Sequence, residues 1–146
     1  MRLLIFEINK NRFLMKIEHL GIAVTDLETA VPLYEKLLGT PCYKQEGVES
    51  EGVKTAFFQT KNSKIELLES IKEDGPIGKF VASKGEGIHH VAFEVDDIYA
   101  EMDRLKKEGF TILNAEPKKG ADNKLVCFIH PKDTRKVLVE LCQEIR

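Results

Sequence analysis

The sequence has no tryptophan, few cysteines and no long hydrophobic run. Its three cysteines, Cys42, Cys127 and Cys142, are odd in number and form no Cys-x-x-Cys pair, which argues against a disulfide framework and a thiolate zinc site. No apolar segment approaches the roughly 20 residues that cross a bilayer, and residues 3–6 are too few for the core of a signal peptide. We therefore expect a cytoplasmic protein without a membrane partner.

An excess of charge of one sign is also missing. The chain carries 22 basic and 24 acidic residues, for a net charge of -2, so it lacks the basic field that drives sequence-independent binding to nucleic acid. Its 146 residues, 42% hydrophobic and 32% charged, are ordinary for one globular domain. We expect a globular protein with no nucleic-acid partner.

One short motif occurs twice. His19-Leu-Gly-Ile-Ala-Val precedes Thr-Asp-Leu, and His90-Val-Ala-Phe-Glu-Val precedes Asp-Asp-Ile, at an offset of 71 residues. In both copies a β-rich run headed by histidine ends at an aspartate that can cap a helix. The two helix patterns stop at Gly39 and Gly109. Pro32 interrupts the first pattern and predicts a bend or a late start of that helix.

Three β-like runs follow each helix pattern. They cover residues 41–46, 53–60 and 64–69 in the first copy, and residues 110–115, 125–130 and 137–142 in the second. The chain thus divides into an N-terminal extension (1–15), a first β-α-β-β-β module (16–70), a linker with a short helix (71–87) and a second module (88–146). Because one such unit buries too little apolar surface alone, the modules of this α+β fold should join their sheets or pack together.

Each copy supplies one histidine and one glutamate at a similar spacing. His19 and Glu66 are 47 residues apart, and His90 and Glu140 are 50 apart. Both glutamates are lone carboxylates in an apolar final strand. A pseudo-twofold axis would bring the four together, and two imidazoles with two carboxylates suit a divalent Co, Mn, Ni or Zn ion. Hydrogen-bonded histidines and solvated glutamates are the competing interpretation, which the matching positions disfavour.

The alternation of side chains along a strand supports this grouping. It places His19 on the same face as Gly21, and His90 on the same face as Ala92. These small neighbours leave room for a ligand. His89 falls on the opposite face, where we expect a structural histidine.

At these residues the chain resembles the vicinal oxygen chelate superfamily, also called the glyoxalase/bleomycin-resistance fold, over about residues 16–143. Residues 87–95, 130–133 and 137–141 look most like the methylmalonyl-CoA epimerases of that superfamily. The resemblance implies tandem βαβββ modules that form a curved mixed sheet around a metal held by the four matched side chains. It also implies interconversion of (R)- and (S)-methylmalonyl-CoA through an enolate, which a metal would stabilise.

The same resemblance suggests roles for individual residues. Glu140 is the expected catalytic base, and a second acid/base group is needed for the other face of the carbon. Some epimerases carry a glutamate where this sequence has Thr55. Lys124, His130 and Lys132 are expected to bind the acyl-CoA thioester, although solvated lysines and turn geometry compete as explanations. We also expect a homodimer.

Other functions remain open. Lactoylglutathione lyase is similar in its four ligands, but its usual Asp-Pro-Asp-Gly before the last strand reads His130-Pro-Lys-Asp here. A metal-free drug-binding module would keep the fold without the ligands, whereas this sequence fills all four positions. A dioxygenase would need two histidines and one carboxylate around iron, and Glu66 weighs against it.

Overall fold

The computed structural model describes residues 14–146, so most of the extension expected at residues 1–15 lies outside the described part. The first β-α-β-β-β set comprises β1 (Lys16–Ala23), α1 (Leu27–Leu38), β2 (Lys44–Val48), a 3-10 turn η1 (Glu49–Glu51), β3 (Val53–Gln59) and β4 (Lys64–Ser70). Helix α2 (Pro76–Lys84) follows. The second set comprises β5 (Gly87–Glu94), α3 (Ile98–Lys107), β6 (Lys118–Lys119), β7 (Lys124–Ile129), a 3-10 turn η2 (Pro131–Asp133) and β8 (Val139–Glu144).

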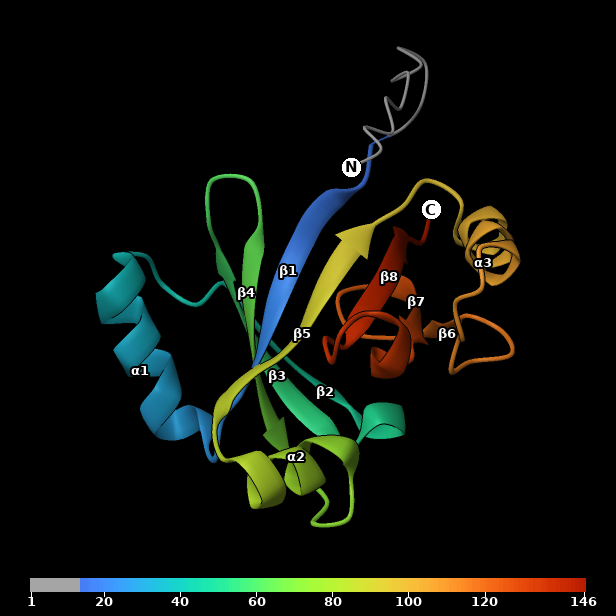
Figure 1. Cartoon of the computed structure of the whole chain (residues 1–146). Coiled ribbons are helices and arrows are strands. Elements are labelled where there is room, and N and C mark those ends of the chain that lie inside the picture. The colour runs from blue at the N-terminus through green and yellow to red at the C-terminus, as the bar shows by residue number, and fades with distance from the viewer. Residues whose placement is uncertain (1–13) are drawn as a thin grey trace, which may run out of the picture.

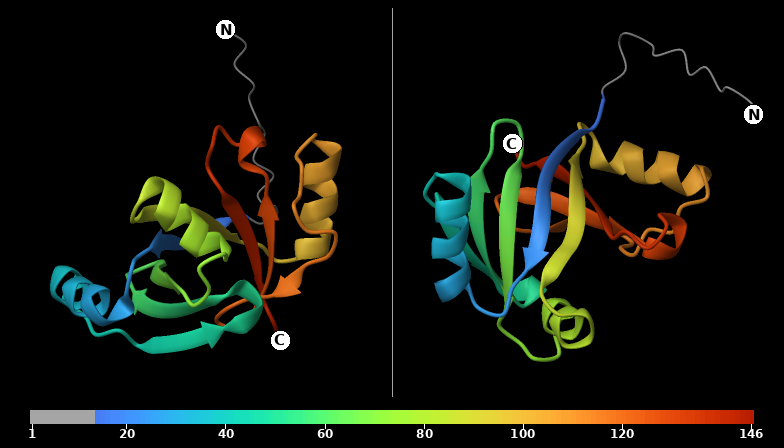
Figure 2. Two further views of the ribbon diagram at one scale, coloured as in Figure 1. Left: turned by 90° about the horizontal axis from the view of Figure 1, so that it is seen from below. Right: turned by 60° about the vertical axis from the view of Figure 1, so that its left-hand side comes forward.

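All eight strands form one mixed sheet in the order β2-β3-β4-β1-β5-β8-β7-β6. At its centre β1 pairs antiparallel with β5, and each is flanked by a parallel partner, β4 or β8. The sheet is strongly curved, with α1 and α3 on its outer side at the two ends (Figure 1). Two further views show the two halves curling toward each other (Figure 2). The expected α+β fold with one curved mixed sheet is confirmed.

The two long helices begin where the sequence predicts. The side chain of Asp26 accepts a hydrogen bond from the Thr29 backbone N–H at the start of α1, and Asp97 caps α3 in the same way. Gly39 ends α1 with a left-handed φ of 67°. Because α1 already starts at Leu27, the late start predicted from Pro32 is wrong: the Asp26 cap and apolar packing offset the lost backbone hydrogen bond.

The strand expected over residues 110–115 does not form. Within this stretch only Ile112 pairs, as an isolated bridge to Ile129. The Phe128 backbone N–H then donates to the side-chain Oδ1 of Asn114 at 2.8 Å, which takes the place of a backbone acceptor. The chain leaves the sheet there, and the short β6 forms the edge instead.

Separate apolar clusters lie under α1 and α3. In the first half, Phe58 and Leu67 of the sheet pack with Val31 and other side chains of α1. In the second, Ile98 and Met102 of α3 pack against Leu141. No helix in residues 14–146 is both long and apolar enough to cross a membrane. Since α1 and α3 cover the outer side of the sheet, the inner side of the central strands is available for a cavity, to whose wall Pro76 and Ile77 of α2 contribute.

Replacement of Phe58 by alanine tests the first cluster. Phe58 is fully buried, so Phe58→Ala should lower the free energy of unfolding by about 3–5 kcal/mol through lost contacts and a residual void. Urea denaturation measures this change. Leu33→Ala is the matched control: that α1 side chain is 62% exposed, and its loss should change stability by less than about 0.5 kcal/mol.

Candidate metal centre

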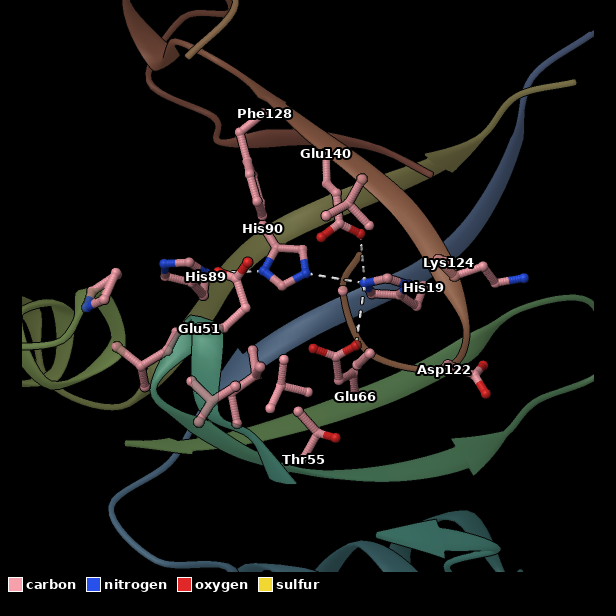
Figure 3. A pocket seen from close by; sticks show the side chains of 18 of the residues that line it. His19, Glu51, Thr55, Glu66, His89, His90, Asp122, Lys124, Phe128 and Glu140 are labelled. Carbon is pink, nitrogen blue, oxygen red and sulfur yellow. Dashed lines mark hydrogen bonds and ion pairs between the residues drawn. The ribbon is translucent and has the colours of Figure 1, made fainter. Parts of the chain in front are cut away.

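Two histidines and two glutamates from four different strands converge inside the curved sheet (Figure 3). The Nε2 atom of His19 lies 3.0 Å from Nε2 of His90, 3.2 Å from Oε2 of Glu140 and 3.5 Å from Oε2 of Glu66. His19, His90 and Glu140 offer ligand atoms that all lie within 4.8 Å of one another. All four side chains are buried. The structure therefore brings together the four residues that the repeat matched.

The register of the central strands explains this convergence. Two equivalent rows cross the sheet, and in each a small residue lies between a histidine on one neighbouring strand and a glutamate on the other. The rows are Glu66–Gly21–His90 and His19–Ala92–Glu140. A Cβ atom on Gly21 would lie 2.1 Å from Cε1 of His90, so only glycine leaves the space that this imidazole occupies.

The electrostatics of this group fit a cation. Oε2 of Glu140 is buried and accepts no hydrogen bond from residues 14–146, although it lies beside His19. Burial raises the pKa of Glu66 to about 7; the Glu140 carboxylate adds to the rise, and His19 opposes it. Burial would lower the pKa of His19, but the Glu140 and Glu18 carboxylates outweigh it and raise that pKa to about 10. Two carboxylates and two imidazoles form a donor set that a divalent ion would hold together.

Glu18 belongs to the same centre, although the strand alternation did not identify it. It is 4% exposed, and its Oε1 accepts a hydrogen bond from Nδ1 of His19 at 3.2 Å. Burial would raise its pKa, but the His19 hydrogen bond and the Lys64 charge outweigh this and lower the pKa to about 2. A β-bulge between Ile17 and His19 inserts Glu18 as an extra residue opposite β5, which turns its side chain inward.

His89 also lines the cavity, so the expectation that it lies on the opposite face is wrong. A second bulge inserts it between Ile88 and His90 on β5. Its Nδ1 lies 2.9 Å from Nδ1 of His90, and its ring packs edge-on against Phe80 at 5.0 Å between centroids. Burial, with a smaller effect of the Lys84 charge, lowers the pKa of His89 to about 4, so the ring is neutral near pH 7.

The cavity above these four side chains has a volume of about 290 Å³ and a largely apolar wall, to which Phe57, Leu68 and Phe128 contribute. A model of the glyoxalase/bleomycin resistance protein/dioxygenase superfamily matches residues 18–128. The chain belongs to this superfamily.

Its relatives within the superfamily include named epimerases. The ethylmalonyl-CoA/methylmalonyl-CoA epimerase of Cereibacter sphaeroides is 43% identical, over 88% of this chain and 97% of that protein. The crystal structure of methylmalonyl-CoA epimerase from Mycobacterium tuberculosis, 32% identical, matches with a TM-score of 0.86 over 90% of this chain and 89% of that one. A Streptomyces coelicolor variant in complex with 2-nitronate-propionyl-CoA, 35% identical, also has a TM-score of 0.86, over 92% of this chain and 100% of that one.

The residues expected to bind substrate lie in two places. Lys124 is buried in the cavity wall of the present protein, and its Nζ lies 3.9 Å from Oε1 of Glu94. His130 and Lys132 lie at η2, outside the residues that line the cavity. There Nδ1 of His130 accepts a hydrogen bond from the Lys132 backbone N–H at 3.0 Å, which stabilises the turn. Their roles in substrate binding remain predictions.

Three ion pairs hold the β6–β7 hairpin against the first half of the chain. Asp122 lies 2.8 Å from Nζ of Lys64 and 3.1 Å from Nζ of Lys44. Lys118 of β6 lies 2.8 Å from Oε1 of Glu51. Asp122, Lys118 and Glu51 line the cavity. Sequence reasoning missed these pairs because their members are far apart along the chain and no local pattern joins them.

The resemblance to the epimerases places Thr55 where some of them carry a glutamate. It is buried in the cavity wall, and its hydroxyl donates to the Glu46 backbone carbonyl at 3.1 Å. Because the hydroxyl is already engaged with the backbone and is not a carboxylate, Thr55 does not supply the second acid/base group.

Enlarging Gly21 tests the packing of the centre. Gly21→Ala should displace the His90 imidazole and weaken Zn²⁺ binding by about tenfold or more, while the far-UV circular dichroism spectrum is preserved. Competition titration against a chelating indicator measures the affinity. Gly47→Ala on β2 is the control, because a Cβ there meets no atom within 4 Å. Equal affinities for the two variants would contradict the packing argument.

Proposed function

We propose that this protein is a methylmalonyl-CoA epimerase, which moves the proton on the carbon between the thioester and the carboxylate from one face to the other. The buried pair of histidines and pair of glutamates at an apolar cavity is the observation that carries the proposal. The similarity to methylmalonyl-CoA epimerases supports the choice of substrate. It extends over 88% of this chain, with 43% identity to the protein of Cereibacter sphaeroides and 40% identity to that of Bos taurus.

The same donor set supports Co, Mn, Ni or Zn at His19, Glu66, His90 and Glu140. When bound, such an ion would supply a Lewis acid for the negative charge that develops on the substrate's oxygens. No thiolate is close enough to favour a softer metal: among the described residues the group of candidate ligands contains nitrogen and oxygen donors alone.

Glu140 is the proposed base. Its Oε2 is buried, engages no hydrogen-bond donor within residues 14–146 and faces the cavity, so it can accept a proton from a carbon held there. The apolar wall around it excludes water, which strengthens charge interactions inside. A proton returned to the opposite face of that carbon inverts the stereocentre.

Lys124 is proposed to attract the anionic acyl-CoA, since its side chain lies in the cavity wall. His130 and Lys132 are proposed to contact the CoA tail outside the cavity, where η2 exposes Lys132. We also propose that two copies associate as a homodimer in the cytoplasm. Sedimentation velocity of the purified protein tests whether it is a dimer, and imaging of a tagged protein tests whether it is cytoplasmic.

Incubation with two substrates separates the enzyme functions. With Zn²⁺, Co²⁺, Mn²⁺ or Ni²⁺ added back, we expect epimerisation of methylmalonyl-CoA and no conversion of the methylglyoxal–glutathione adduct, both followed by chiral or reverse-phase chromatography. Turnover of the glutathione adduct alone would replace the epimerase by a lactoylglutathione lyase. Full epimerase activity after exhaustive chelation would refute the role of the metal.

Replacement of Glu140 tests the base. Glu140→Gln should abolish deuterium uptake at the substrate's α-carbon in heavy water, a loss of at least about 100-fold, because the amide cannot accept the proton. Nuclear magnetic resonance measures the uptake, with the metal content of each preparation determined in parallel. Glu144→Gln, at the exposed end of the same strand, should exchange at the wild-type rate. Unchanged exchange in Glu140→Gln would exclude this residue as the base.

A further inference from the structure

Glu18 and His89 occupy equivalent positions in the two halves of the chain. Each directly precedes one of the paired histidines, and they are separated by the same 71 residues as His19 and His90. The β-bulges that insert them are related in the same way, because each adds one residue opposite the other central strand. The internal symmetry therefore extends beyond the four ligands to a second pair of side chains.

Both side chains make the same kind of contact. Glu18 Oε1 lies 3.2 Å from Nδ1 of His19, and His89 Nδ1 lies 2.9 Å from Nδ1 of His90. The other ring nitrogens, the two Nε2 atoms, face each other at 3.0 Å in the middle of the site (Figure 3). Each ligand imidazole is thus held on its outer nitrogen by its neighbour in sequence while its inner nitrogen is directed to the centre.

We propose that Glu18 and His89 are positioning residues, which keep the Nδ1 protons of His19 and His90 in place and so direct two Nε2 lone pairs at the metal. This inference rests on the proposed metal centre. An ionised carboxylate can only accept a hydrogen bond, so it requires a proton on Nδ1 of His19. At 2.9 Å between the two Nδ1 atoms one nitrogen must donate to the other, so Nδ1 of His89 can accept from Nδ1 of His90 when His90 binds a metal through Nε2.

Each positioning side chain is itself held from behind. Lys64 Nζ lies 3.3 Å from Oε2 of Glu18 and 2.8 Å from Oδ2 of Asp122, so the lysine that pairs with the Glu18 carboxylate is itself held by the second half of the chain. His89 has no such charge partner within 4.0 Å in the described chain; the edge-on ring of Phe80 supports it. A charged acceptor makes imidazole a stronger donor to a metal than a neutral acceptor does. In the proposed centre, His19 is therefore supported by a charged acceptor, Glu18, and His90 by another imidazole, His89.

The affinity for Zn²⁺, measured by competition with a chelating indicator, tests the proposal in four variants. Glu18→Ala and His89→Ala should each bind the ion about 10–100-fold more weakly than the wild type. Glu18→Gln and His89→Gln should recover part of that loss, because an amide oxygen can still accept the Nδ1 proton. The Co²⁺-loaded variants should also show shifted visible absorption bands, which a change in stability alone would not produce.

His130→Gln and Glu94→Gln are the controls for metal binding, since neither side chain contacts His19 or His90. Both should match the wild type in Zn²⁺ affinity and in the Co²⁺ spectrum. If Glu18→Ala fails to fold, because it leaves Lys64 with one partner fewer, Glu18→Gln and the two His89 variants carry the test. Wild-type affinity and an unshifted Co²⁺ spectrum in these three variants would overturn the positioning roles. Absence of metal binding in the wild type would instead refute the metal centre and the proposed function, a distinct result.

Discussion

The arrangement of two imidazole nitrogens and two carboxylates around one buried point is the constraint on which the rest of this structure depends. Two carboxylates and two unprotonated ring nitrogens are costly to bury together, because like charges and lone pairs repel and little water can reach them. A bound cation reverses that balance, since each repelling group becomes a ligand. In the proposed reaction, the apolar wall above the point would keep a substrate's reacting carbon dry and close to Glu140.

The sheet provides this arrangement through pairing within one chain. Because β1 and β5 run antiparallel at the centre, equivalent residues of the two halves face each other, and the parallel neighbours β4 and β8 add one carboxylate from each side. Helices α1 and α3 remain on the outer side, where their apolar faces stabilise each half without filling the cavity.

Much of this could be predicted from the sequence. The order of elements, the two capped helices and the convergence of four side chains follow from an internal repeat and from period-two alternation. The inward direction of Glu18 and His89 could not be predicted, because a bulge adds one residue and reverses the alternation, and no residue type marks it reliably. The strand expected over residues 110–115 does not form for a related reason. The Asn114 side chain replaces a backbone acceptor of the sheet, and the pattern of residue types does not predict this replacement.

The two bulges show what joining both halves in a single polypeptide makes possible. An assembly built from two identical half-chains would be forced to carry the same residue at both bulges, two glutamates or two histidines. In one continuous chain the positions vary independently, and here one is an acid tied to a lysine while the other is a neutral ring against a phenylalanine. An ion bound there would thus meet unlike histidines on its two sides, so a substrate that offered it two different oxygens would bind in one preferred orientation.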